Sequence, residues 1–103
     1  MKFIRGKEFT AERAWGALDV TNMDGITVRI HWTDAPYKWH TNDGEEVFVV
    51  LDGIVEMHYR ENGTEQVIVL EAGDLFFAEV GCEHVAHPRG EARILVVEKE
   101  GSV

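Results

Sequence analysis

Residues 44–74 read GEEVFVVLDGIVEMHYRENGTEQVIVLEAGD, and this stretch decides the fold. It holds three short runs, 47–51, 54–59 and 66–70, which are rich in apolar and β-branched residues and too short for helices. Between the runs stand Asp52-Gly53 and Asn62-Gly63, pairs that favour tight hairpin turns, type I′ for the first. The stretch therefore predicts consecutive antiparallel strands joined by tight turns.

The same pattern continues on both sides of this stretch. Apolar and polar side chains alternate over residues 26–32, with a turn at 22–25 before them, and short runs separated by Gly or Pro follow up to residue 98. Near the N-terminus, Thr10 is a candidate cap for a short helix through Ala14. Seven or eight short strands with Gly-marked turns predict an all-β antiparallel sandwich or barrel.

Composition limits both the class of protein and its partners. The chain has 103 residues, which suits one domain. Its 10 Lys and Arg against 19 Asp and Glu give a net charge of -9, which argues against binding to nucleic acid or to an anionic membrane. Cys82 is the only cysteine, and neither a signal peptide nor a membrane-spanning run stands out. We therefore expect a cytoplasmic protein.

Glu46 is the first candidate for a functional side chain. In an extended strand it shares a face with Phe48 and Val50, so it should lie at the mouth of an apolar interior. An unpaired charge there costs several kcal/mol, so either a bound cation or a partner such as Arg29 should accompany it. His84 follows a turn on another strand, and a closed sheet can bring it opposite Glu46. Imidazole and carboxylate together suit divalent transition metals.

The opposite face of the same strand is also apolar. It carries Val47, Val49 and Leu51, and a strand that is apolar on both faces must be covered on both. We expect either another sheet or a second subunit to cover this face. Phe76 and Phe77 are interpreted as core residues.

Two motifs in the chain resemble those of the cupin superfamily. The first cupin motif, G(X)5HXH(X)3,4E(X)6G, matches WHTNDGEEVFVVLDG through His40, Glu46 and Gly53, with six residues between the last two. Asn42 stands where the motif has its second histidine, and Asp34 where it has its leading glycine. An alignment that places His40 at the second histidine makes the spacing to Glu46 one residue too long.

The second cupin motif, G(X)5PXG(X)2H(X)3N, matches GDLFFAEVGCEHVAHP. Gly73, Gly81 and His84 fall at the motif spacing, whereas Glu79 replaces the proline and Pro88 the asparagine. The resemblance covers about residues 26–98. It implies a cupin-type antiparallel β-barrel, the jelly-roll or double-stranded β-helix, as a single domain over residues 1–103 with its core barrel at about 26–98.

The resemblance also implies a metal site. In cupins the two histidines and the glutamate of the first motif and the histidine of the second bind one metal ion, which leaves His40, Glu46 and His84 here. Two imidazoles and a carboxylate suit Fe, Mn, Ni or Zn and leave positions open for water or a ligand. Asn42 offers only a neutral amide oxygen, so we expect weak binding. Small cupins are commonly homodimers, and we expect one here.

We therefore expect a small metal-binding cupin that binds a small organic molecule in the barrel. If the protein is an enzyme, it also transforms that molecule. The alternative is a ligand-binding or sensing protein without catalysis, whose metal site is degenerate because of Asn42. The superfamily hosts dioxygenases, isomerases, decarboxylases and regulators, so the fold alone selects none of them.

Overall fold

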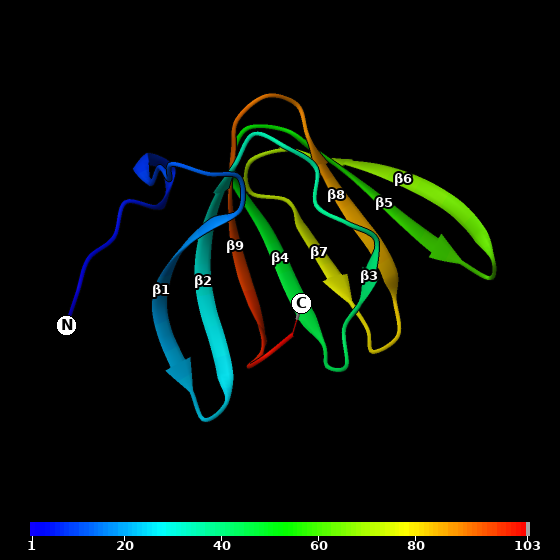
Figure 1. The fold of residues 1–103 in the computed structure, drawn as a ribbon, viewed down its shortest axis with the longest axis horizontal. Helices are drawn as coiled ribbons and strands as arrows, with labels where there is room; N and C mark the ends of the chain where they lie inside the picture. The colour runs from blue at the N-terminus through cyan, green and yellow to red at the C-terminus, as the bar shows by residue number, and fades with distance from the viewer. Residues whose placement is uncertain (103) are drawn as a thin grey trace.

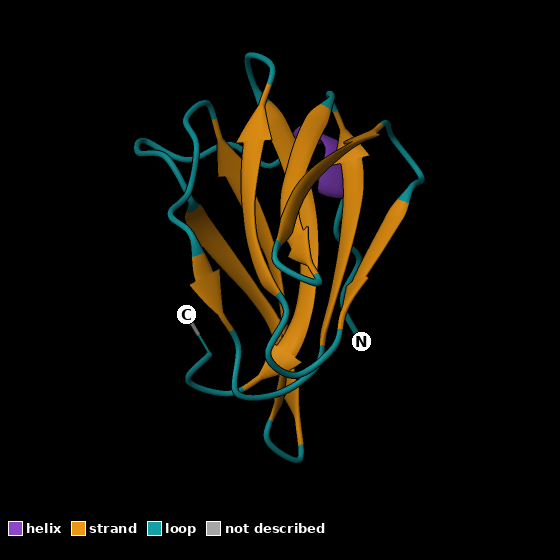
Figure 2. Ribbon diagram, turned by 90° about the vertical axis from the view of Figure 1, so that its right-hand side faces the viewer, coloured by secondary structure: helices purple, strands orange, loops and turns teal. Residues whose placement is uncertain are grey.

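The computed structural model describes residues 1–102, and its regular secondary structure is almost entirely strands (Figures 1 and 2). A 3-10 helix, η1, spans Gly6–Glu8, and none of the described residues forms a helix long and apolar enough to cross a membrane. The strands are β1 Gly16–Met23, β2 Ile26–Thr33, β3 His40–Thr41, β4 Glu46–Asp52, β5 Val55–Glu61, β6 Thr64–Leu70, β7 Leu75–Ala78, β8 Glu83–Pro88 and β9 Ala92–Lys99.

These strands form two antiparallel sheets, which confirms the predicted all-β class. One has five strands in the order β1-β2-β9-β4-β7, and the other has four in the order β3-β8-β5-β6. From β2 onward the chain crosses repeatedly between the sheets, since β4 lies in the first, β5 and β6 in the second, β7 in the first, β8 in the second and β9 in the first again. Two facing sheets with such crossings form a jelly roll.

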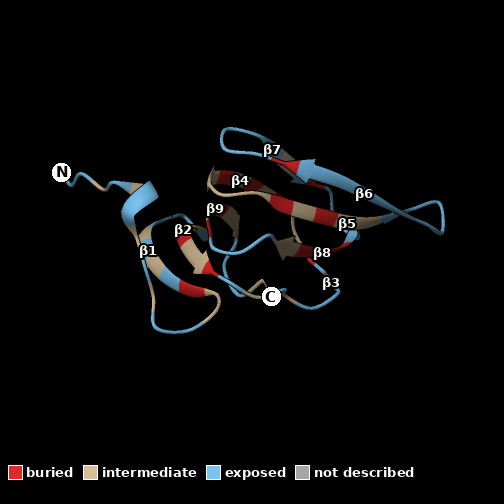
Figure 3. Ribbon diagram, turned by 90° about the horizontal axis from the view of Figure 1, so that it is seen from above, coloured by how far each residue is buried: buried red, intermediate tan, exposed pale blue. Residues whose placement is uncertain are grey.

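The core lies between the two sheets, where alternate side chains of each strand point. Phe48 and Val50 of β4 are 3% and 0% exposed, as the alternation predicted, and Ile94 of β9 is fully buried beside them. Val55 and Met57 of β5, both 0% exposed, pack against these residues from the other sheet (Figure 3). Glu46 is 5% exposed at the end of the same inward face.

The two Gly-containing pairs have different roles. Asn62 and Gly63 have φ values of 53° and 77° and join the hydrogen-bonded strands β5 and β6, so a tight hairpin turn is confirmed there. The hairpin predicted at Asp52-Gly53 is wrong, because β4 and β5 belong to different sheets. Gly53, with a φ of 90°, instead turns the chain through the corner between them.

The N-terminal prediction is also wrong. Residues 10–14 form no helix, and the first sheet begins at Gly16, in a stretch for which the sequence pattern predicted no strand. Trp15 has a φ of 62°, which a right-handed helix does not allow, and its indole Nε1 donates a hydrogen bond to the Ala35 carbonyl 2.9 Å away. A contact distant in sequence therefore overrides the local signal of Thr10.

Candidate metal centre

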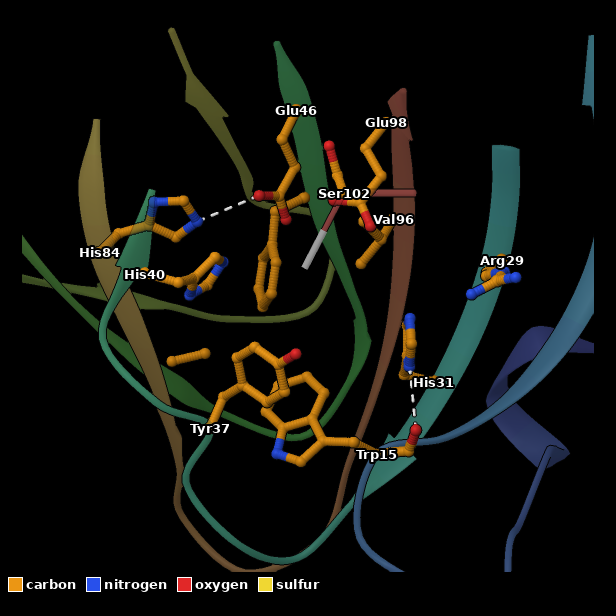
Figure 4. A pocket seen from close by; sticks show the side chains of 12 residues that line it. Trp15, Arg29, His31, Tyr37, His40, Glu46, His84, Val96, Glu98 and Ser102 are labelled. Atoms are coloured by element: carbon orange, nitrogen blue, oxygen red, sulfur yellow. Dashed lines mark hydrogen bonds and ion pairs between the residues drawn. The ribbon is translucent and has the colours of Figure 1, made fainter. Parts of the chain in front are cut away.

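His40, Glu46 and His84 meet at one end of the space between the sheets. His40 of β3 and His84 of β8 are register partners, and Glu46 of β4 faces them from the other sheet (Figure 4). One ligand atom from each residue lies within 4.8 Å of the other two. Within residues 1–102 no other set of three His, Cys, Asp or Glu side chains is gathered as closely.

Both imidazoles are held by their Nδ1 atoms. His40 Nδ1 lies 2.9 Å from the Lys38 carbonyl oxygen, and His84 Nδ1 lies 3.0 Å from that of Cys82. A carbonyl oxygen only accepts, so each Nδ1 carries a proton and each Nε2 is the atom left to bind a metal. Metal-binding histidines usually donate their other N–H in this way, which fixes tautomer and ring orientation.

In the absence of a metal, His84 and Glu46 form a buried ion pair. His84 Nε2 lies 3.0 Å from Glu46 Oε1, and the two side chains are 2% and 6% exposed. Burial alone would lower the pKa of His84, but the hydrogen bond to Glu46 and its negative charge outweigh burial and raise that pKa. Burial would raise the pKa of Glu46, and the same pairing lowers it.

His40 is the neutral member of the cluster. Burial, opposed by the Lys38 carbonyl and assisted by the charge of His84, lowers its pKa below the usual 6.5. Its ring centroid lies 4.3 Å from that of His84. A metal binding at neutral pH therefore meets one imidazole already free of the Nε2 proton.

Asn42 lies beside this cluster and supports a cation site. It is 4% exposed, and its Nδ2 donates a hydrogen bond to Glu46 Oε1. Its Oδ1 is buried without a hydrogen-bond partner, the one such side-chain atom found in the part of the chain that the structure describes. A buried acceptor without a partner costs about 1–3 kcal/mol. A cation held by the neighbouring side chains would remove that cost, so the residues present fit a metal.

A cavity of about 150 Å³ opens from the three candidate ligands into the barrel. Trp15, Tyr37 and Phe48 line it with aromatic surface, and the Trp15 and Tyr37 rings meet edge to face with centroids 5.1 Å apart. His31 of β2 also lines it, and burial lowers the pKa of that imidazole. The metal centre and a ligand-sized space are therefore continuous.

Two charged residues line the same cavity. Arg29 bonds to Asp19, with its Nε 2.7 Å from Oδ1, so the alternative that it pairs with Glu46 is wrong. Glu98 of β9 stands opposite Glu46 in register, and burial together with the charge of Glu46 raises its pKa to about 7. Glu98 was not predicted from the sequence, although it shares the inward face of Ile94 and Val96 just as Glu46 shares that of Phe48.

The two remaining histidines, His58 and His87, do not line the cavity. His58 of β5 and His87 of β8 have ring centroids 4.3 Å apart. His58 lies 3.8 Å from Glu56 and 3.6 Å from Glu65, and its side chain is 21% exposed. This pair has no part in the candidate centre.

The comparisons with known proteins agree with this architecture. A family model described as the cupin domain matches residues 25–98. The chain belongs to the cupin family. No curated protein matches it. The cupin resemblance of the two sequence motifs is therefore confirmed.

Solved cupin structures superpose over most of the chain. A cupin-2 domain protein from Shewanella frigidimarina is 24% identical with a TM-score of 0.77, over 87% of this chain and 85% of its own. A Thermus thermophilus protein is 19% identical with a TM-score of 0.78, over 96% and 95%. Hydroquinone 1,2-dioxygenase from a Sphingomonas species, solved with 4-hydroxybenzoate, is 16% identical with a TM-score of 0.74, over 87% and 68%. These similarities support the cupin jelly roll.

Proposed function

We propose that this cupin binds one divalent transition metal ion, Fe, Mn, Ni or Zn, through His40, Glu46 and His84, and holds a small organic molecule beside it. The observation that carries this proposal is the orientation of the two histidines. Carbonyl groups hold both Nδ1 atoms, and the Nε2 atoms are left for a ligand next to a buried carboxylate. A bound divalent ion would supply Lewis acidity and open coordination positions in the cavity.

The side chains have distinct tasks in this proposal. Glu46 supplies the negative charge, and Asn42 donates to one of its oxygens and so holds the carboxylate in place. His84 must give up its Nε2 proton, so binding competes with the ion pair to Glu46 and weakens as the pH falls. Asn42 Oδ1 is a further neutral oxygen donor beside the site.

The cavity supports an organic ligand about the size of a single ring. Its volume of about 150 Å³ equals that of an engineered protein cavity known to bind benzene. Trp15 and Tyr37 offer ring faces and edges, His31 offers an imidazole beside Trp15, and Glu98 offers a carboxyl group near Glu46. An aromatic ring bearing a hydroxyl or carboxyl group matches this combination. One structural neighbour is a dioxygenase solved with 4-hydroxybenzoate.

A non-catalytic sensing role is the second candidate, and Asn42 favours it. The neutral amide replaces an imidazole, so the metal is held by fewer strong donors and its occupancy follows the supply of metal or ligand. The single cysteine, Cys82, fits a reducing compartment, and we place either function in the cytoplasm. Turnover of a bound phenol or carboxylate with loaded metal would favour the enzyme over the sensor.

Metal content tests the first half of the proposal. Protein without an affinity tag is loaded with Fe(II), Mn(II), Ni(II) or Zn(II), passed over a sizing column and analysed for metal. We expect close to one equivalent of at least one metal, and less than about a tenth of an equivalent of every metal would refute the proposal. His40→Ala and His84→Ala should each weaken binding more than about 100-fold. His87→Ala is the matched control on the outer surface and should bind like the native chain.

Thermal shifts test the second half. Metal-loaded protein is heated with 4-hydroxybenzoate and related single-ring phenols and carboxylates, and at least one should raise the midpoint of unfolding. Ala86→Leu fills part of the cavity and should abolish the shift while it keeps the metal. Equal shifts in the native chain and this variant would place the ligand elsewhere.

A further inference from the structure

His40, one of the three proposed metal ligands, lies on a strand that backbone pairing alone holds weakly. β3 has two residues, His40 and Thr41, and lies at the edge of the four-stranded sheet, where β8 is its neighbour (Figure 1). Strands in globular proteins are usually about 3–10 residues long. Irregular segments, 34–39 and 42–45, flank β3 on both sides. Side-chain contacts must therefore help to keep His40 beside its register partner His84.

Such contacts form on the outer face of this sheet. The guanidinium carbon of Arg60, on β5, lies 3.9 Å from the ring centroid of Trp39, the residue before His40. The same guanidinium donates a hydrogen bond from Nη1 to Glu83 Oε2, on β8, and forms an ion pair there. We call Trp39, Arg60 and Glu83 the outer clamp. It joins the segment before β3 to two neighbouring strands of the sheet.

The outer clamp holds the backbone directly next to both proposed histidine ligands. Trp39 precedes His40, and Glu83 precedes His84. Because successive side chains of an extended chain point to opposite faces, the two clamp residues point outward where the two histidines point into the barrel. None of the three clamp residues lines the cavity beside the metal centre. The clamp therefore acts on the histidines through the backbone of β3 and β8.

We propose that Arg60 is a positioning residue of the metal centre, which holds His40 beside His84 from the opposite face of the sheet. This role rests on the proposed function, because the two imidazoles are taken as metal ligands. A guanidinium group is attracted to the face of a Trp ring, and the ion pair with Glu83 keeps Arg60 in this place. Groups that orient metal ligands from outside the ligand set typically change metal affinity about 10–100-fold.

The charge of Arg60 gives this role a distinctive sign. A positive charge near a cation site weakens cation binding, so its removal alone should strengthen binding. Loss of the outer clamp should instead weaken binding, because a loosened β3 must be ordered before His40 can reach the metal. Arg60→Met keeps an unbranched apolar stem and removes the charge, so the direction of the change in affinity separates the two effects.

The metal affinity of the full chain tests the role of Arg60. Titration calorimetry uses whichever of Fe(II), Mn(II), Ni(II) and Zn(II) loads the native chain best. Arg60→Met should fold, as judged by circular dichroism, and bind this metal at least about 10-fold more weakly. Arg60→Lys should lie between the two, since an ammonium group can also stack on Trp39 and pair with Glu83.

Arg89→Met is the matched control. Arg89 follows β8, and its Nε lies 2.8 Å from Glu56 Oε2 in a partly exposed ion pair. Its substitution removes the same charge but no contact with Trp39, so the affinity should stay within about twofold of the native value. Equal losses in Arg89→Met and Arg60→Met would overturn the positioning role, because charge alone would then be responsible.

A second control removes His40 itself. In a His40→Ala background, Arg60→Met should cause little further loss of metal affinity, because its effect passes through His40. A further loss as large as the one in the native chain would mean that Arg60 does not act by positioning this imidazole.

Proton NMR of the metal-free protein tests the position of His40 without any metal. The ring centroids of His40 and His84 are 4.3 Å apart, so nuclear Overhauser contacts should join the rings in the native chain and in Arg89→Met. Arg60→Met should weaken these contacts. A native chain that binds no metal would refute the proposed function, and the ring contacts would still decide the role of Arg60. Unchanged contacts in Arg60→Met, or metal binding as tight as in the native chain or tighter, would overturn that role.

Discussion

Glu98 is a carboxyl group on the cavity wall whose pKa is raised to about 7 by burial and by the charge of Glu46. A raised carboxyl pKa means that ionisation costs stability in the folded state, from the ordinary pKa near 4.5 upward, and the full cost is reached above pH 7. Glu98→Gln should therefore stabilise the metal-free protein by about 1–2 kcal/mol at pH 8, after allowance for solvent screening, and much less at pH 5. Urea unfolding with a chelator measures both values.

The matched control for this prediction is Glu45→Gln. Glu45 is exposed, and its substitution removes the same charge from the chain. A pH-dependent gain of equal size in this variant would show that net charge, and not the position of Glu98, is responsible. No gain at pH 8 in Glu98→Gln would contradict the raised pKa directly.

At the residue scale, spacing and strand alternation predicted which three side chains meet. Glu46 could be placed inward because Phe48 and Val50 share its face, and the two motifs brought His40 and His84 to it. The orphaned oxygen of Asn42 depends on the packing of a loop against β4, which no periodicity contains. Glu98 was accessible to the same reasoning as Glu46 but lies outside both motifs.

At the scale of elements, Gly53 connects the two sheets. A Cβ added there would lie 2.5 Å from the Glu91 carbonyl oxygen and 3.1 Å from Ala92 Cα, at a φ of 90°. Backbone conformation and overpacking both oppose a side chain, so Gly53→Ala should lower the free energy of unfolding by about 2–4 kcal/mol. Gly63 has a positive φ but nothing within 4 Å, so Gly63→Ala should cost about 1–2 kcal/mol.

Chemical unfolding of Gly53→Ala and Gly63→Ala separates the cost of the backbone conformation from the cost of overpacking. Equal losses of unfolding free energy in the two variants would mean that the close approach of Gly53 to β9 does not matter.

The position of Gly53 also explains why the hairpin predicted at Asp52-Gly53 was wrong. An Asp-Gly pair specifies the turn, but which strand the chain pairs with afterwards depends on contacts with β9 and β8, which are distant in sequence.

At the scale of the whole molecule, the strand pattern with its turns predicted an antiparallel barrel, and the two motifs identified the cupin fold. Burial depends on neighbours that a single strand does not reveal, and β7 shows this. Its Phe76 packs against the core and Phe77 faces outward, although the sequence offers two adjacent phenylalanines with no difference between them. Only the register with β4 places Phe77 beside Val47 on the outer side of the sheet. Phe77 is 52% exposed there, so its interpretation as a core residue is wrong.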